Sequence, residues 1–335
     1  MQISVVIPTC NRKLRLLSLL RDLDRSMYPI YEVIIVDSGE DALPAKDYSA
    51  FNKFRIEYIR SEKSVCIQRN IGIRKATSDW VFLCDDDIEI PEDYLEKLVK
   101  HIEAYPATAA VSGSWLQKEG EEWKATYPEN SAARLIWKYI FQLSIWGEIN
   151  SAAHNVFTKK VKKYYGRRGN HISRAGWPVL TDFSGEYFTT PVYSLGASLV
   201  KKEWLIHSPF DEVLDRFGIG DNYGVIVDFP VPVIHVLNNT VVYHHQEPMN
   251  RLQRPLQYYR RALALDYFIK TKKNLEGVKR ISLLWSLIGN LVSFIFSGNW
   301  GMIKPGFKSA WKIALGKNPY YTAAKKKQKV LEPGL

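Results

Sequence analysis

Cysteine is scarce in this sequence, with only Cys10, Cys66 and Cys84 among its 335 residues. None of them has the close CxxC spacing of a zinc site, and the set does not resemble a disulfide framework. We therefore expect reduced cysteines and a cytosolic protein. No positively charged segment followed by an apolar one precedes the first predicted strand, which begins at residue 3, so we also expect no secretory signal peptide.

Glycine-rich phosphate-binding loops are also missing. The turn after the first predicted strand is Pro8-Thr9-Cys10-Asn11-Arg12, which matches neither GxGxxG nor GxxxxGK(S/T). Both of those motifs use glycine so that backbone N–H groups can approach phosphate closely. The absence disfavours a dinucleotide-dependent dehydrogenase and a P-loop enzyme.

The balance of charge, in contrast, is strongly basic, with 46 Lys and Arg against 35 Asp and Glu and a formal net charge of +11. Such a balance suits a polyanionic partner, which could be a nucleic acid, an anionic lipid or a phosphorylated substrate. Basic and aromatic residues mix between Lys159 and Gly169, as they do in some nucleic-acid binders. No RNP, helix-turn-helix or zinc pattern accompanies them, so we expect no nucleic-acid partner.

Strand and helix patterns alternate along the first 105 residues. Short apolar runs predict strands at 3–7, 31–36, 55–59 and 80–84, and helices are predicted at 13–23, 63–75 and 91–105. This alternation predicts an α/β fold with a mainly parallel sheet flanked by helices. Because right-handed crossovers bring all strand-to-helix loops to one edge of the sheet, Thr9, Asp37 and the residues after Cys84 should converge.

Three consecutive acids, Asp85, Asp86 and Asp87, directly follow the buried strand predicted at 80–84. In open α/β sheets this is the edge at which ligands bind. Adjacent carboxylates repel one another unless a cation or bound water offsets their charge. A hard divalent metal would do so and would in turn hold a phosphate. The alternative is a solvated acidic turn, which the position directly after a buried strand disfavours.

Three segments in order resemble a family 2 glycosyltransferase with the GT-A fold. They are VVIPTCNR at 5–12, VIIVDSG at 33–39 and RNIGIRKATSDWVFLCDDD at 69–87. The resemblance is strong over residues 1–115 and extends more weakly to about residue 250. It implies a Rossmann-like mixed sheet, a nucleotide-sugar donor, a divalent metal (Mg²⁺ or Mn²⁺) and, for most of the family, inversion at the anomeric carbon.

The resemblance also implies which residues bind the nucleotide. Thr9 and Arg12 match the loop that lines the nucleotide pocket. Asp37 matches the acid that contacts the base or the ribose, and Arg69 matches an arginine of the helix beside the nucleotide. Each has a simpler explanation: Thr9 and Asp37 could be turn residues, and the two arginines could be solvated helix charges.

For the three acids, the resemblance implies separate roles. Asp85 tends to contact the ribose or the sugar, Asp87 tends to coordinate the metal, and Asp86 has a supporting role beside the donor. A bound cation would stabilise the negative charge that the diphosphate gains as the glycosidic bond breaks. Some family members add a histidine ligand where this chain has His244-His245. Adjacent strand residues face opposite sides, so only one of the two should face the site, and we choose His244 as the metal ligand. Both histidines could instead be structural.

The residue that accepts the proton of the acceptor hydroxyl is harder to assign. Residues 209–222 resemble the family segment FDE…ED, in which an acid activates that hydroxyl. This chain has Gly220-Asp221 where many relatives have Glu-Asp. We choose Asp221 as the catalytic base and keep Asp215 and Asp211 as alternatives.

Residues 281–296, ISLLWSLIGNLVSFIF, form an uncharged run that is short for a membrane-spanning helix. Flanking lysines, arginines and tryptophans suit an interfacial helix on an anionic membrane, while a soluble packing helix and a true span remain alternatives. We expect a glycosyltransferase domain at 1–250, with a donor half at 1–115 and an acceptor half at 116–250. A helical, basic and aromatic region at 251–335 would associate with the membrane.

Together these features predict an enzyme that transfers a sugar from a nucleoside diphosphate donor to an acceptor hydroxyl. The acceptor would be a growing surface glycan or a lipid-linked saccharide, and the enzyme would work at the cytoplasmic face of a membrane. Two alternatives remain open. One is a nucleotidyltransferase acting on sugar phosphates, and the other is a non-catalytic, membrane-associated scaffold with the same fold.

Overall fold

The computed structural model describes residues 1–125, 130–149, 155–245 and 252–335, and it divides into two compact units. Unit 1 comprises Met1–Ala125, Gly185–Glu212 and Phe229–Asn250. Unit 2 comprises Thr126–Ser184, Val213–Asp228 and Arg251–Leu335. Both units therefore use segments from distant parts of the chain, and the expected domain boundary at residue 250 stays a prediction.

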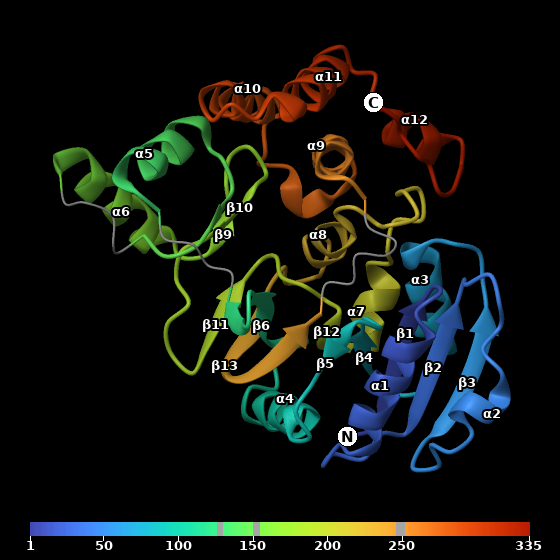
Figure 1. Cartoon of the computed structure of the whole chain (residues 1–335). Coiled ribbons are helices and arrows are strands. Elements are labelled where there is room, and N and C mark those ends of the chain that lie inside the picture. The colour runs from blue at the N-terminus through green and yellow to red at the C-terminus, as the bar shows by residue number, and fades with distance from the viewer. Residues whose placement is uncertain (126–129, 150–154, 246–251) are drawn as a thin grey trace. The chain divides into compact units, whose positions relative to one another are not determined.

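Unit 1 is built on a mixed sheet with the strand order β11-β13-β6-β12-β4-β1-β2-β3, with β5 paired to β13 and β7 paired to β6 (Figure 1). The strands are β1 (Ile3–Thr9), β2 (Glu32–Asp37), β3 (Arg55–Arg60), β4 (Trp80–Cys84), β5 (Ile88–Glu89), β6 (Ala110–Glu119), β7 (Glu122–Ala125), β11 (Tyr187–Thr190), β12 (Ala197–Lys201) and β13 (Ile234–His244). Strands β1 to β4 run parallel, whereas β12 lies antiparallel between β4 and β6.

Helices cover both faces of the parallel part of this sheet. They are α1 (Lys13–Asp24), α2 (Ala45–Tyr48), α3 (Val65–Lys75), α4 (Tyr94–Ala104) and α7 (Lys202–His207). The apolar sides of α1 and α4 share one core with Ile3, Val5 and Ile7 of β1. Helix α3 packs on the other face, where Gly72 lies so close to Val6 that a Cβ at Gly72 would be 2.3 Å from it. Burial on both faces explains why β1, β2 and β4 are mainly apolar.

The predicted elements of the first 105 residues are confirmed with small shifts at their ends. The largest shift is at the helix expected from residue 91, which begins at Tyr94. Pro91 instead opens a turn that is closed by a hydrogen bond from Tyr94 N to the Pro91 carbonyl at 3.0 Å. The α/β fold class, with a mainly parallel sheet flanked by helices and further helices toward the C-terminus, is therefore confirmed.

Unit 2 is mainly helical and has a small sheet of its own, in the order β8-β10-β9. Its strands are β8 (Ile145–Trp146), β9 (His171–Ile172) and β10 (Pro178–Leu180). Its helices are α5 (Ala132–Phe141), α6 (Val156–Arg168), α8 (Asp221–Ile226), α9 (Arg254–Thr271), η1 (Lys273–Leu275), α10 (Arg280–Phe296), η2 (Trp300–Met302), α11 (Ile303–Ala314) and α12 (Pro319–Lys325).

Helix α10 contains the uncharged run that the sequence placed at 281–296. It packs against α5, where the rings of Phe141 and Trp285 stack with centroids 4.6 Å apart and Gly289 faces Phe141. In the described residues, no helix is both long enough and apolar enough to cross a bilayer.

Candidate active site

The carboxyl ends of β1, β2 and β4 form the edge of unit 1 at which the residues predicted to bind the donor lie. Thr9 is the last residue of β1 and pairs in register with Asp37, the last residue of β2. The Thr9 hydroxyl also donates a hydrogen bond to Asp86 Oδ2 at 2.7 Å, in the turn after β4. The predicted convergence of these loops therefore occurs, with Thr9 in contact with the acidic turn.

The acidic turn is compensated by an arginine. Arg12 Nη1 donates to Asp86 Oδ1 at 2.8 Å and to Asp87 Oδ2 at 3.2 Å. Asp86 and Asp87 are each only 4% exposed, so a solvated acidic turn does not describe them. Burial raises the pKa of Asp86 to about 6, and the nearby Asp87 adds to the rise while Arg12 and the Thr9 hydrogen bond oppose it. The simpler explanation of Arg12 as a solvated helix charge is also excluded.

Asp85 lies on a different side of the turn, where it pairs with the arginine predicted beside the nucleotide. Arg69 Nη2 donates to Asp85 Oδ1 at 2.5 Å, and the Asp85 backbone N donates to the Gly196 carbonyl at 2.7 Å. The Arg69 side chain is 5% exposed, and its guanidinium lies 5.0 Å from the centre of the Phe210 ring. Arg69 is thus fixed in place rather than mobile in solvent, and it orients Asp85.

Asp37 is bound into its own turn. Its Oδ1 accepts from Gly39 N at 2.7 Å, and its Oδ2 accepts from Tyr58 at 2.5 Å and Arg60 at 3.0 Å. These contacts fit a turn-stabilising residue, and contact with a donor nucleotide stays a prediction. Burial and the hydrogen bond to Asp37 raise the pKa of Tyr58. No sequence signal selects Tyr58 or Arg60, because alternate residues of an edge strand are polar for many reasons.

His244 lies next to Asp87 in unit 1. Its Nε2 is 3.5 Å from Asp87 Oδ1, and its ring contacts Trp115 edge-on with centroids 5.0 Å apart. His245 instead points to Glu89, with His245 Nε2 at 3.0 Å from Glu89 Oε2. The two histidines therefore face different partners, as expected for adjacent strand residues, and His244 is the one beside the acids.

The residues present fit a divalent ion at Asp87 and His244. Their facing atoms are close enough to bind one ion, and Mg²⁺ and Mn²⁺ sites commonly use one or two protein ligands completed by substrate phosphates and water. Within residues 1–125, 130–149, 155–245 and 252–335, no group of three or more His, Cys, Asp and Glu side chains is arranged to hold a metal. Both residues' role as metal ligands stays a prediction.

Asp221, the predicted catalytic base, belongs to unit 2. It is the first residue of α8, follows Gly220 in a left-handed conformation (φ 95°), and accepts a hydrogen bond from Asn222 N at 2.6 Å. Of the two alternatives, Asp211 belongs to unit 1. Asp215 is fully buried, with Arg260 Nη1 at 3.3 Å and the Tyr320 hydroxyl at 3.1 Å, which fits a structural role.

Two polar residues of α3 that the sequence analysis missed hold the site together. Gln68 Nε2 donates to the carbonyls of Thr9 at 2.8 Å and Val36 at 2.6 Å, which ties the ends of β1 and β2 to the helix. Asn70 exchanges hydrogen bonds with the backbone of Phe210 at 2.9 and 3.0 Å. One sequence feature could have indicated these two residues. Residues 68–70 are three consecutive polar residues in a helix that must pack on a sheet, so some of them must be buried and hydrogen-bonded.

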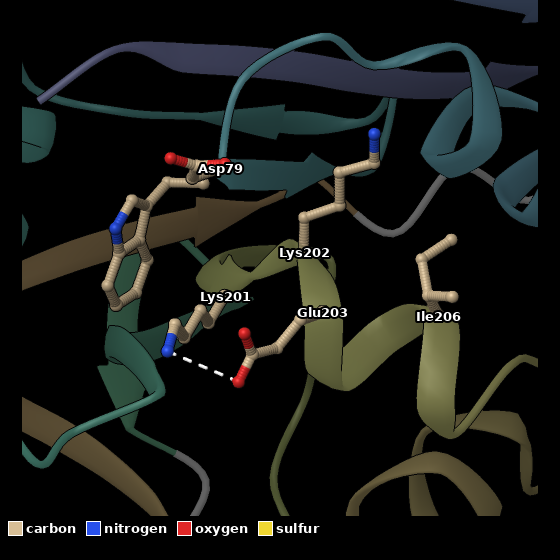
Figure 2. Close-up of a pocket in the computed structure, with 6 residues that line it drawn as sticks. Asp79, Lys201, Lys202, Glu203 and Ile206 are labelled. Atoms are coloured by element: carbon tan, nitrogen blue, oxygen red, sulfur yellow. Dashed lines mark hydrogen bonds and ion pairs between the residues drawn. The ribbon is translucent and has the colours of Figure 1, made fainter.

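A separate cavity in unit 1 lies at the opposite end of β4. Figure 2 shows its lining residues, which come from the start of β4 and from the β12–α7 junction, with an ion pair of 3.2 Å between Lys201 and Glu203. Asp79 and Trp80 precede the apolar part of β4, whereas the acidic turn follows it. This cavity is therefore not the candidate active site.

The comparison with solved structures concerns the class of fold to which this protein belongs. Residues 1–349 of TarS from S. aureus, solved in complex with UDP-GlcNAc, superpose with a TM-score of 0.55. The superposition covers 98% of this chain and 93% of that one at 13% sequence identity, which supports a shared GT-A fold and nothing finer.

The sequence comparisons match the N-terminal part of the chain to a family. Residues 4–162 match the family model "Glycosyl transferase family 2". The chain is 39% identical over 106 residues to the uncharacterized glycosyltransferase YwdF of Bacillus subtilis, and 37% identical over 109 residues to an uncharacterized glycosyltransferase of Haemophilus influenzae. The matches cover 31% of this chain in both cases, and 39% and 35% of those relatives. Over this N-terminal part, the chain is therefore similar to the members of glycosyltransferase family 2.

Proposed function

We propose that this protein transfers a sugar from a nucleoside diphosphate donor to an acceptor hydroxyl. The observation that carries the proposal is the acidic turn after β4, in which each carboxylate has its own set of partners. Asp85 pairs with Arg69, Asp86 pairs with Thr9 and Arg12, and Asp87 pairs with Arg12 and faces His244. The match of residues 4–162 to the family 2 model and the similarity to a structure solved with UDP-GlcNAc support a nucleotide-sugar as the donor.

In this proposal, Asp87 and His244 hold Mg²⁺ or Mn²⁺, and the ion, when bound, stabilises the negative charge on the leaving diphosphate. Arg12 and Arg69 provide further positive charge at the same edge of the sheet. Thr9, Arg12, Asp37 and Arg69 would line the nucleotide site. Asp85, held by Arg69, has an oxygen left to accept a hydrogen bond from a ribose or sugar hydroxyl.

The proposed base is Asp221, which would take the proton from the acceptor hydroxyl as its oxygen attacks the anomeric carbon. A single displacement of this kind inverts the configuration at that carbon. The burial of Asp215 beside Arg260 and Tyr320 favours Asp221 over that alternative.

The proposed acceptor is a growing surface glycan or a lipid-linked saccharide, at the cytoplasmic face of a membrane. Two observations support this placement. Cysteine is scarce, as is usual for proteins of a reducing compartment, and the C-terminal helices combine exposed aromatic side chains with lysines.

A thermal-shift panel of UDP-, GDP-, CDP- and dTDP-sugars, each with and without Mn²⁺, tests the donor and the metal together. We expect one nucleotide class to raise the melting temperature, and more so with Mn²⁺. Asp87→Asn should lose the Mn²⁺-dependent part of this shift, whereas the surface variant Asp93→Asn should keep it. A full Mn²⁺-dependent shift in Asp87→Asn would refute the metal assignment.

The reaction products separate the proposed enzyme from the two alternatives. A glycosyltransferase releases a nucleoside diphosphate, whereas a nucleotidyltransferase releases pyrophosphate. Pyrophosphate release from a sugar phosphate and a nucleoside triphosphate would overturn the proposal. The absence of a thermal shift with all four nucleotide classes would favour the non-catalytic scaffold.

A further inference from the structure

Unit 2 carries an exposed apolar face on α10 and α11. The exposed residues of α10 are Ile281, Trp285, Ile288, Ile295 and Phe296, and those of α11 with its C-terminal cap are Phe307, Trp311 and Leu315. Their spacing of three, four and seven residues puts them on one side of each helix. Leu283 and Leu287 of α10, and Ile313 of α11, are fully buried on the opposite sides. Each helix thus has an apolar stripe in solvent in addition to its packed one.

The two helices pack against each other (Figure 1), so the exposed stripes lie on neighbouring helices. Gly306 of α11 allows the close approach, since a Cβ there would be 2.7 Å from Leu291 of α10. Both helices contact α9 with their buried sides. Phe294 of α10 packs edge-on against Tyr258, and Lys308 of α11 lies over the ring of Tyr259. We call the exposed side of this pair the α10–α11 face.

The segment that contains this face has charge of one sign only. Residues 277–331 contain ten Lys and Arg and no Asp or Glu, while the rest of the chain has 36 Lys and Arg against 35 Asp and Glu. Nearly all of the net charge of +11 therefore resides in this segment. Among the described residues, no carboxylate forms an ion pair with Lys304, Lys312 or Lys317. Lys304 and Lys312 of α11, and Lys317 after it, are thus available to an external anion.

We propose that the α10–α11 face docks on the surface of an anionic lipid bilayer. Tryptophan and phenylalanine side chains are favoured at the headgroup level, and lysines beside them attract anionic lipid phosphates. The helices lie along the surface, since neither is long and apolar enough to span the bilayer. Pairing with a second copy of the same face is disfavoured, because it would bring two strongly positive segments together without an acid between them.

This inference rests on the membrane-associated part of the proposed function and names the surface responsible for it. Docking on the bilayer would place the protein close to an acceptor that is anchored in the same bilayer, and this raises the effective concentration of the acceptor. It does not depend on which nucleotide-sugar is the donor. Vesicle binding and nucleotide binding can therefore fail separately.

Vesicle flotation of the full chain tests the inference. The protein is mixed with vesicles of phosphatidylcholine alone or of phosphatidylcholine with about 30% phosphatidylglycerol. We expect binding to the anionic vesicles that falls with added salt, and little binding to the neutral ones. The variant Phe307→Ser/Trp311→Ser removes two side chains that are 61% and 55% exposed, and it should bind at least about tenfold more weakly. The control variant Leu14→Ser/Met27→Ser removes two apolar side chains of unit 1 that are at least as exposed as Phe307 and Trp311. This variant should bind like the wild type.

A second variant tests the contribution of the lysines to vesicle binding. Lys304→Gln/Lys312→Gln should weaken binding to anionic vesicles by about fivefold for each lysine, and Lys46→Gln/Lys100→Gln should not. Far-UV circular dichroism and the nucleotide-dependent thermal shift should be unchanged in all four variants, since none alters the candidate active site. Wild-type protein that ignores anionic vesicles, or equal binding by test and control variants, would overturn the inference. So would a wild-type dimer in sedimentation equilibrium that Phe307→Ser/Trp311→Ser converts to a monomer.

Discussion

The substitution Gly196→Ala should disturb the acidic turn by displacing the carboxylate of Asp85. A Cβ at Gly196 would lie 2.1 Å from Asp85 Oδ2 and 2.3 Å from Asp85 Cγ, far inside contact distance. Gly196 does not have a positive φ, so alanine introduces no backbone strain there. In Gly196→Ala the Asp85 carboxylate must therefore rotate away, and it gives up its hydrogen bond from Arg69.

The cost of this rotation is that of a charge-assisted hydrogen bond. Arg69 is 5% exposed, so it cannot easily exchange Asp85 for water. Breaking such a bond should lower the free energy of unfolding by about 2 kcal/mol. Asp85→Ala removes the same bond and should cost about the same. The double variant has no carboxylate at position 85 for the new methyl group to displace, so the total should stay near ~2 kcal/mol instead of doubling.

Urea unfolding of the wild type, the two single variants and the double variant measures this coupling. We expect the single effects to overlap almost completely, with a coupling energy of about 2 kcal/mol. The same four proteins should show parallel losses of the nucleotide-dependent thermal shift, because Gly196→Ala acts only by displacing Asp85. Additive effects, equal to the sum of the single ones within about 0.5 kcal/mol, would show that residue 196 does not act through Asp85.

Two further predictions concern stability. Burial opposes the charge on Glu32, but hydrogen bonds led by those from Thr77 outweigh it and hold its pKa at about 2, below the ordinary 4.5. Because the folded pKa is depressed, this carboxylate stabilises the fold above pH 4.5 and loses that effect as the pH falls toward 2. Urea unfolding should show Glu32→Gln less stable than the wild type by about 2–3 kcal/mol at about pH 7, with a gap that closes in acid; a pH-independent gap contradicts the assignment. In unit 2, a Cβ at Gly289 would be 2.3 Å from Phe141 Cγ, so Gly289→Ala should lower the free energy of unfolding by about 1–3 kcal/mol. Gly277→Ala meets open space and serves as its control; equal melting temperatures for the two variants would contradict the packing argument.

The parallel half of the fold was predictable because its signals are local. Strands β1, β2 and β4 are buried on both faces, and each therefore has a mainly apolar sequence. Strand β12 was harder to place. It lies antiparallel between β4 and β6, which are both far from it in sequence. No feature of residues 197–201 indicates with which strands they pair. Long-range pairing of this kind depends on the whole sheet.

The candidate site divides in the same way. Acids after a buried strand indicated a ligand-binding edge, and the structure places Thr9, Arg12 and Arg69 against them. The partner of each carboxylate was not predictable, because it depends on side-chain directions across three loops. Asp37 illustrates how far the prediction from sequence reached. Its position at the end of a strand was predicted, whereas its hydrogen bonds from Tyr58 and Arg60 were not.

The partners of the three acids also explain why this turn has three carboxylates in a row. Asp86 is almost fully buried, and its pKa of about 6 shows that its charge is costly even with Arg12 beside it. Its hydrogen bonds from Thr9 and Arg12 join the end of β1 and the start of α1 to the turn. In the proposed enzyme, Asp86 therefore acts on a donor through those two residues, while Asp85 and Asp87, on either side, face a sugar and a cation. An arrangement with only two acids would have to use one of them for both anchoring and binding.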